Sequence, residues 1–345
     1  MFKNLWIWIS GLVLSIFGYT SFQNLSINPE ISVPSYQSPI SISYLRSINI
    51  ESSNLNIEQK LADGTNYERF IVSYQSEGYK VYALLTFPKG EKPEGGFQAI
   101  VFNHGYIPPK QYSTQSNYVS YVDYLARNGF VVLKIDFRGH GQSEGIASGS
   151  YFSSSYTKDA IAALKSLQKF DKVNPEKIGF WGHSMSGNLV LRSMLVTNQV
   201  KAGVIWAGAV YSYEDFGKYR IQDNSFSPSQ TRPSAVLISD PNRDTNQYIS
   251  KLRENYKEID FKNDYWKEIS LTENINYLEM PLQIHHSIND SVVNIGYSRD
   301  LVDVLKQSNK TYEYYEYQYG SHNIEGVSFN TAMDRTVTFF KNNLK

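Results

Sequence analysis

Residues 177–196 read KIGFWGHSMSGNLVLRSMLV, and this stretch carries the strongest structural signal in the sequence. A short apolar run, IGFW, leads directly into GHSMSG at 182–187 and then into an apolar helical pattern. Only small residues fit two places either side of Ser184, because strand and helix backbones converge at such a sharp turn. Position 186 is Ser where Gly is usual, but Ser is small enough for the turn to form. The pattern predicts a nucleophile elbow with Ser184 at its tip; the alternative is that Ser184 is an ordinary helix N-cap.

Short apolar runs alternate with amphipathic helical stretches on both sides of this turn. We expect strands at 99–103, 130–136, 177–182, 202–208, 281–286 and 312–319, and helices near 117–128, 155–170, 184–197, 296–307 and 326–343. Upstream, ERFIVSY and YKVYALLTF flank a turn at 75–78 and predict an antiparallel hairpin. The alternation predicts an α/β fold with a mostly parallel central sheet and helices on both faces.

The alternation lapses between residues 211 and 277. This stretch is polar and aromatic, with charged helical pieces such as TNQYISKLRENYKEI at 245–259. In open α/β sheets ligands bind outside the carboxyl ends of the strands, and an insertion between two late strands is well placed to cover that edge. We therefore expect one domain over residues 68–345, with a cap insertion at 211–277.

The amino-terminal region has a different character. Residues 5–22 (LWIWISGLVLSIFGYTSF) are mostly apolar and follow a single lysine, Lys3. The pattern predicts that residues 1–22 are a cleaved signal peptide or an uncleaved membrane anchor, with the positive end on the cytoplasmic side and the rest exported. Both modes stay open. Residues 23–67 are expected to be a spacer and N-terminal extension with loosely attached strands.

Composition excludes several classes of protein. The chain has 345 residues, 33 basic and 33 acidic side chains, and no cysteine. Zero cysteines exclude disulfide frameworks, thiolate zinc sites and cysteine nucleophiles. A net charge of zero without blocks of like charge argues against a nucleic-acid partner. No motif for a metal or cofactor stands out, so we expect neither. The oligomeric state stays open.

The turn at 182–187, NHGY at 103–106, DFRGHGQS at 136–143 and a late Asp and His together resemble the α/β-hydrolase superfamily. More narrowly they resemble the catalytic domain of the prolyl oligopeptidase family (S9-type) and its esterase-like relatives. The resemblance covers residues 68–345 and implies an α/β-hydrolase fold. The β-propeller that gates true oligopeptidases is not expected, because residues 23–67 are too few to form one.

A serine that transfers acyl groups needs a general base, most often histidine. Of the six histidines, the order Ser, acid, His of this fold favours His322, which follows the last predicted strand. Asp290, four residues beyond the strand at 281–286, is the candidate that orients His322. The alternatives are a surface-loop histidine and, for Asp290, a helix N-cap. Ser287 replaces a Gly of the family pattern in the turn before Asp290.

Backbone amides are expected to stabilise the oxyanion. By position these belong to Tyr106 and Met185, and the resemblance adds the Tyr106 hydroxyl as a second possibility. Together the residues predict a serine hydrolase that cleaves a small acyl ester or a peptide through an acyl-enzyme, as a peptidase of prolyl oligopeptidase type or a carboxylesterase. The alternative is a non-catalytic binding or scaffold protein that retains the fold, an idea favoured by Ser186 and Ser287.

Overall fold

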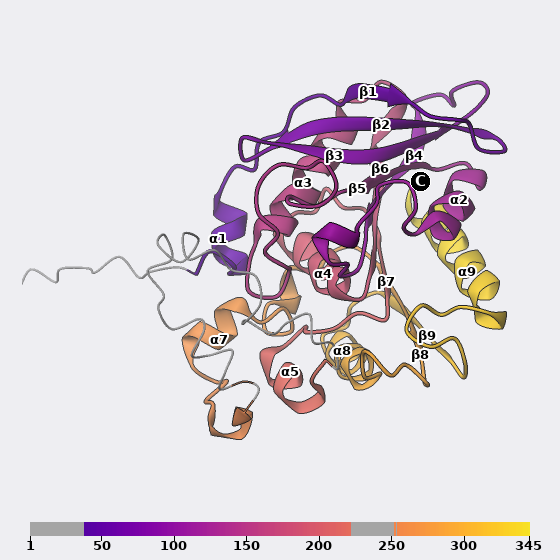
Figure 1. Cartoon of the computed structure of the whole chain (residues 1–345). Helices are drawn as coiled ribbons and strands as arrows, with labels where there is room; N and C mark the ends of the chain where they lie inside the picture. The colour runs from indigo at the N-terminus through magenta and orange to yellow at the C-terminus, as the bar shows by residue number, and fades with distance from the viewer. Residues whose placement is uncertain (1–37, 222–251, 253) are drawn as a thin grey trace, which may run out of the picture. The chain divides into compact units, whose positions relative to one another are not determined.

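The centre of the fold is a single sheet (Figure 1). The computed structural model describes residues 38–221, 252 and 254–345, and these form nine strands in the order β1-β2-β3-β5-β4-β6-β7-β8-β9. The first three pairings are antiparallel and all the others are parallel. The strands are β1 (Asn56–Lys60), β2 (Tyr67–Ser76), β3 (Tyr79–Pro88), β4 (Phe97–Asn103), β5 (Val131–Ile135), β6 (Val173–His183), β7 (Gly203–Trp206), β8 (Leu282–Ser287) and β9 (Tyr312–Tyr317).

Helices cover both faces of the sheet. One face is covered by α3 (Ser155–Gln168), α4 (Met185–Val196) and α8 (Gly296–Gln307), and the other by α2 (Val119–Arg127) and α9 (Val327–Asn343). The remaining described helices are α1 (Ile42–Ser47), α5 (Tyr213–Tyr219) and α7 (Asp264–Ile269), with short 3-10 turns at Pro109–Gln111, Tyr256–Glu258 and Ile275–Tyr277.

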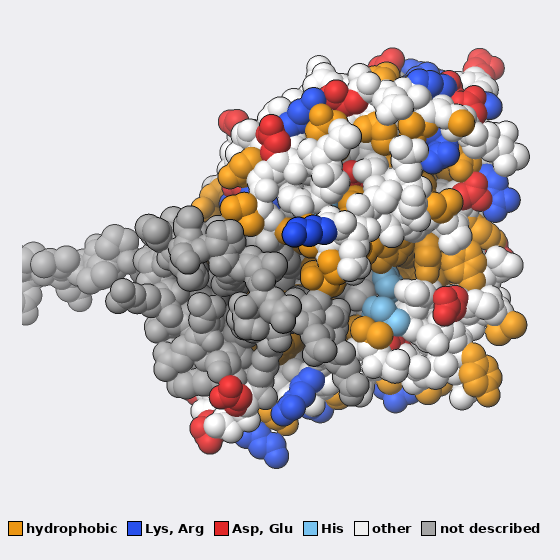
Figure 2. Space-filling view, viewed as in Figure 1, with side chains coloured by type: hydrophobic (Ala, Val, Ile, Leu, Met, Phe, Trp, Pro, Cys, Tyr) orange, Lys and Arg blue, Asp and Glu red, His pale blue; other side chains and the backbone are white. Residues whose placement is uncertain are grey.

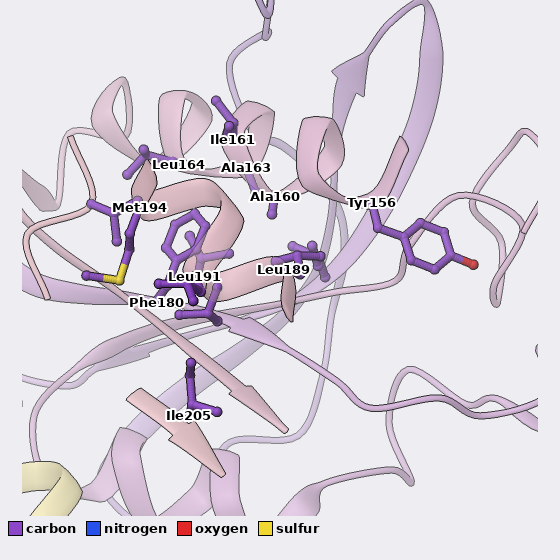
Figure 3. Packing of buried hydrophobic residues seen from close by; sticks show 14 of the residues in the cluster. Tyr156, Ala160, Ile161, Ala163, Leu164, Phe180, Leu189, Leu191, Met194 and Ile205 are labelled. Atoms are coloured by element: carbon purple, nitrogen blue, oxygen red, sulfur yellow. The ribbon is translucent and has the colours of Figure 1, made fainter. Parts of the chain in front are cut away.

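Strand side chains alternate between two apolar cores, as a sheet with two covered faces requires. In β4, Val101 faces the core under α3 and α4, whereas Ile100 and Phe102 face the core under α2 and α9. Figure 3 shows the first core, where Leu191 of α4 lies near Phe180 of β6. The central strands are apolar along their length because both faces of the sheet are covered by helices. The predicted α/β fold with a mostly parallel central sheet is confirmed.

The amino-terminal extension differs from our expectation in one respect. The edge strand β1 is exposed along its whole length, as a loosely attached strand should be. The residues before it, however, form α1, whose Ile42 and Leu45 are fully buried and which packs against α4 and α7. Arg46 also donates to the carbonyl of Leu195 at the end of α4, at 2.8 Å. Residues 38–67 therefore belong to the same compact unit as the rest of the described chain.

The predicted insertion lies where the pattern placed it, between β7 and β8. The described parts of this insertion also contribute to the hydrophobic core. Tyr213 of α5 and Trp266 of α7 are buried and in ring contact, with centroids 5.2 Å apart. Residues 222–251 and 253 lie outside the described residues, so a substrate-selecting cap stays a prediction. The apolar segment 5–22 also lies outside them; among the residues described, no helix has the length and apolar character to cross a membrane.

A buried ion pair holds the loop that follows β5. The Asp159 carboxylate of α3 accepts hydrogen bonds from the backbone N–H, Nε and Nη2 of Arg138, and both side chains are buried. Arg138 therefore has a structural role in this loop, and Asp159 is its countercharge.

Replacing Asp159 by Asn should lower the free energy of unfolding by about 3–5 kcal/mol, because it leaves the buried guanidinium short of its main countercharge. Chemical denaturation measures this loss. Glu77→Gln is the matched control: Glu77 contacts the same guanidinium at 3.0 Å but is exposed, so its loss should cost less than about 1 kcal/mol. Equal losses in the two variants would contradict the assignment.

Candidate active site

Ser184 lies at the tip of a sharp turn between β6 and α4. Its backbone has φ 54° and ψ −120°, a conformation that L-residues rarely adopt. The turn is held because Ser184 N–H donates to the Trp206 carbonyl and Gly187 N–H donates to the Ser184 carbonyl, each at 2.8 Å. Ser184 occupies the N-cap position of α4, yet its side chain makes no capping hydrogen bond to the described amides of that helix. The geometry is that of the predicted elbow.

Small residues are required around this turn for steric reasons. A Cβ at position 182 would lie 2.6 Å from the Ser186 carbonyl oxygen and from a methyl group of Val190. A Cβ at position 187 would lie 2.6 Å from the Cα of Gly208. Ser186 is tolerated because its buried hydroxyl donates to the carbonyl of His104 at 2.6 Å. The departure from the usual glycine therefore adds a hydrogen bond to the turn after β4.

Asp290 and His322 are brought together by the loops that follow β8 and β9. The His322 Nδ1–H donates to Asp290 Oδ2 at 2.8 Å. In a neutral imidazole this leaves Nε2 as the basic nitrogen. The turn before Asp290 closes although Ser287 stands in place of glycine, since Asp290 N–H donates to the Ser287 carbonyl at 3.2 Å.

The Asp290 carboxylate has more donors than the sequence indicated. Its Oδ1 accepts from the N–H groups of Val292 and Val293, at 2.8 and 2.9 Å, and its Oδ2 lies 3.2 Å from His286 Nε2. Burial alone would raise the pKa of this carboxyl, but the hydrogen bonds from His286 and His322 outweigh burial and hold the pKa well below its usual range. Asp290 is therefore an ionised, fully buried acceptor beside His322. Sequence reasoning missed His286, although its adjacency to the Asp290 turn is visible in the sequence.

Ser184 and His322 line one cavity of about 600 Å³. Its wall combines aromatic and apolar side chains with polar ones, and it holds one carboxylate among the described lining residues, that of Glu325. Figure 2 shows histidine surface, in pale blue, next to hydrophobic side chains on this face of the molecule. None of the described residues between 211 and 277 lines this cavity. Ile221 forms an isolated antiparallel bridge to Val293, the residue that follows Val292 of the wall in the sequence.

The predicted oxyanion donors lie next to the serine. Met185 is the first residue of α4, so its N–H belongs to the first-turn amides that have no acceptor within the helix. Gly105 and Tyr106 line the same cavity as Ser184. A Cβ at position 105 would lie 3.2 Å from the Cβ of Ser184, which places the turn after β4 directly beside the serine.

Two further residues of the site were missed by sequence reasoning. His183 Nε2 donates to the His322 carbonyl at 3.0 Å, and Tyr118 donates to His183 Nδ1 at 2.7 Å. Burial, reinforced by the neighbouring His322, lowers the pKa of His183 to about 3, so its ring is neutral and has one donor and one acceptor nitrogen. Tyr118 begins α2 in a left-handed conformation, with φ 59°, a feature that its sequence did not indicate.

The remaining histidines do not occupy the general-base position. His285 and His286 point to opposite faces of β8: His285 contacts Tyr317 and Gln283, and His286 contacts Ser298 of α8 as well as Asp290. His104 and His140 are buried behind the turn after β4, with ring centroids 5.2 Å apart.

Comparison with known proteins identifies a family and a sequence relative. Residues 97–325 match the model of a family described as serine aminopeptidase, S33. An uncharacterised peptidase, YtmA, from Bacillus subtilis (strain 168) is 23% identical over 257 residues, which are 73% of this chain and 85% of that protein.

Solved structures resemble the fold. The acylaminoacyl peptidase of Pyrococcus horikoshii superposes with a TM-score of 0.61 at 20% identity, covering 81% of this chain and 42% of that one. Acetyl xylan esterase 1 from Thermoanaerobacterium superposes with a TM-score of 0.59 at 14% identity, covering 88% and 91%. At these identities the likeness shows the α/β-hydrolase fold alone.

Proposed function

The chain belongs to the serine aminopeptidase family, S33, and is a serine hydrolase; on this premise we propose that Ser184, His322 and Asp290 are its catalytic triad. The observation that carries the proposal is the 2.8 Å hydrogen bond to Asp290 from His322, which lines the same cavity as the strained Ser184. A serine, a histidine and a carboxylate in this relation form an activated nucleophile.

In the acylation step, Ser184 Oγ attacks the acyl carbon of the substrate and its proton passes to His322 Nε2. The imidazolium that forms is stabilised by the ionised Asp290 carboxylate, which also fixes the ring tautomer. The N–H groups of Tyr106 and Met185 donate hydrogen bonds to the carbonyl oxygen and stabilise the negative charge that develops on it. Collapse of the tetrahedral intermediate breaks the bond to the leaving group, which takes the proton from His322.

Deacylation reverses the roles. Water gives a proton to His322 as its oxygen attacks the acyl carbon. The second tetrahedral intermediate then collapses, His322 returns the proton to Ser184 Oγ, and the carboxylic acid leaves. His322 therefore gains and loses one proton in each half of the cycle, and Ser184 ends the cycle protonated. These steps fit both an ester and an amide, because the two differ only in the leaving group that His322 protonates.

We propose small acyl esters and short peptides as substrates, consistent with a cavity of about 600 Å³. The test is a panel of aminoacyl amides and short-chain esters, with kcat/KM measured for each. Turnover of amides as fast as esters with the same acyl group would favour a peptidase; turnover of esters alone would favour a carboxylesterase. Pure wild-type protein that turns over neither class would favour a binding protein that retains the fold.

We further propose, from residues 1–22 alone, that the chain is exported and held at or released from a membrane. The full chain should then fractionate with membranes or appear outside the cytoplasm, and a variant that begins at about residue 30 should be soluble and fully active. Cell fractionation with an activity assay measures both. Full-length protein found wholly in the cytosol would contradict export.

A further inference from the structure

Side chains hold two successive peptide groups of the turn after β4. The carbonyl of the His104–Gly105 peptide accepts from Ser186 Oγ at 2.6 Å, and its N–H donates to the Tyr118 hydroxyl at 2.8 Å. The carbonyl of the next peptide, Gly105–Tyr106, accepts from His104 Nδ1 at 2.6 Å. The N–H of this second peptide is that of Tyr106, the proposed oxyanion donor.

We infer that Ser186 and Tyr118 are positioning residues for the oxyanion hole, an inference that rests on the proposed function. A peptide group is planar, so hydrogen bonds to both ends of the His104–Gly105 peptide fix its plane. That plane, with the bond from His104 to the Gly105 carbonyl, sets the direction of the Tyr106 N–H before substrate binds. A donor held in advance needs no reorganisation when charge develops in the transition state.

Ser186 has this role only because it is not glycine. Its hydroxyl is fully buried and lies on the first turn of α4, two residues after the nucleophile. The same helix that presents Ser184 and Met185 therefore also anchors the opposite wall of the oxyanion hole. A glycine at this position would keep the elbow and lose the anchor.

Tyr118 extends the anchor to the loop of the general base. Its hydroxyl accepts from Gly105 N–H and donates to His183 Nδ1, and His183 in turn donates to the His322 carbonyl. One chain of hydrogen bonds thus connects the turn that carries the oxyanion donor to the loop that carries His322. Each group in the chain has a donor or acceptor role that is consistent with a neutral His183.

The test compares an oxygen ester with the matching thionoester, in which sulfur replaces the carbonyl oxygen. Sulfur is larger and a weaker acceptor, so its reaction gains less from a well-placed amide. In Ser186→Ala, Ser186→Gly and Tyr118→Phe, kcat for the oxygen ester should fall about 10–100-fold, less than the loss of a direct oxyanion donor. KM should change less than about twofold, and the thionoester rate should fall much less, so the ratio of the two rates drops.

Two variants serve as matched controls. Ser193→Ala removes another buried hydroxyl of α4, which has no hydrogen-bond partner among the described residues. Tyr124→Phe removes another hydroxyl of α2, one that donates to Asp334 at the surface. Both should leave kcat and the ratio of the two rates unchanged. Circular dichroism and thermal unfolding identify any variant that does not fold. Because three variants at two positions are tested, the failure of one to fold leaves the others to decide the result.

The outcomes separate this inference from the proposed function. A lower ratio in the folded anchor variants, with unchanged controls, supports the inference. Equal loss on both esters means a merely structural role and overturns it, as does no loss at all. Failure of the wild type to react with a fluorophosphonate would instead contradict the proposed function itself.

Discussion

Replacing Ser184 by alanine should lower kcat by about 10⁴–10⁶-fold, and His322→Ala should lower it by a similar factor. The reason is that neither residue works without the other: the serine is a weak nucleophile until the imidazole removes its proton. The double variant should be little worse than either single variant, because members of a triad act as a unit. Steady-state kinetics with the best ester of the panel measure all three.

The control for this set is Ser193→Ala, which removes a hydroxyl from the same helix without touching the cavity. Its kcat should equal that of the wild type. Additive losses in the double variant would show that Ser184 and His322 act independently. Activity that survives Ser184→Ala would contradict the mechanism entirely.

Asp290→Asn should lower kcat by about 10³–10⁴-fold. In the wild type one oxygen of Asp290 accepts from two backbone N–H groups, and the other contacts His286 and His322. Whichever of the two oxygens is replaced by the amide NH₂ of asparagine, the NH₂ faces other donors instead of accepting from them. The ring of His322 then keeps its place but loses the tautomer that leaves Nε2 basic. Asp303→Asn is the control, since Asp303 is an exposed residue of α8 and its replacement should not change kcat. Equal rates for Asp290→Asn and the wild type would rule out Asp290 as the orienting acid.

The same carboxyl should make stability depend on pH. Its folded-state pKa lies below the value of about 4 expected in the unfolded chain. A carboxyl whose pKa is lowered on folding stabilises the fold above the unfolded-state pKa, and this contribution is lost as the pH falls toward the folded-state pKa. The difference in unfolding free energy between wild type and Asp290→Asn should therefore be largest above about pH 5 and shrink below pH 4. A difference that does not change with pH would contradict the lowered pKa.

Local patterns were sufficient to predict most of the fold. The helix expected at 296–307 is α8 with the same bounds, and the hairpin of β2 and β3 lies where alternation and the turn at 75–78 placed it. These elements have strong periodicity and clear ends, so few alternatives compete. Ser184 was also predicted from a local pattern, whereas Asp290 and His322 were chosen by the order Ser, acid, His of the resembling fold, and all three lie in loops that follow strands.

Features that depend on contacts distant in sequence were not predictable. Helix α1 is only six residues long, and its burial against α4 is what stabilises it. The partners of Ser186 and Tyr118 are carbonyl, amide and imidazole groups about 10 to 80 residues away, and no spacing rule indicates them. The sequence alone therefore shows Ser186 only as a departure from the elbow pattern. The structure shows that its hydroxyl donates a hydrogen bond to the His104 carbonyl.

The most direct test of the triad is reaction with a fluorophosphonate, followed by intact-protein mass and peptide mapping. An activated serine forms a covalent adduct, whereas a helix-capping serine does not. We predict one adduct per chain at Ser184, none in Ser184→Ala, and slow labelling in His322→Ala. An unlabelled wild-type protein, or an adduct mapped to any other residue, would contradict this prediction.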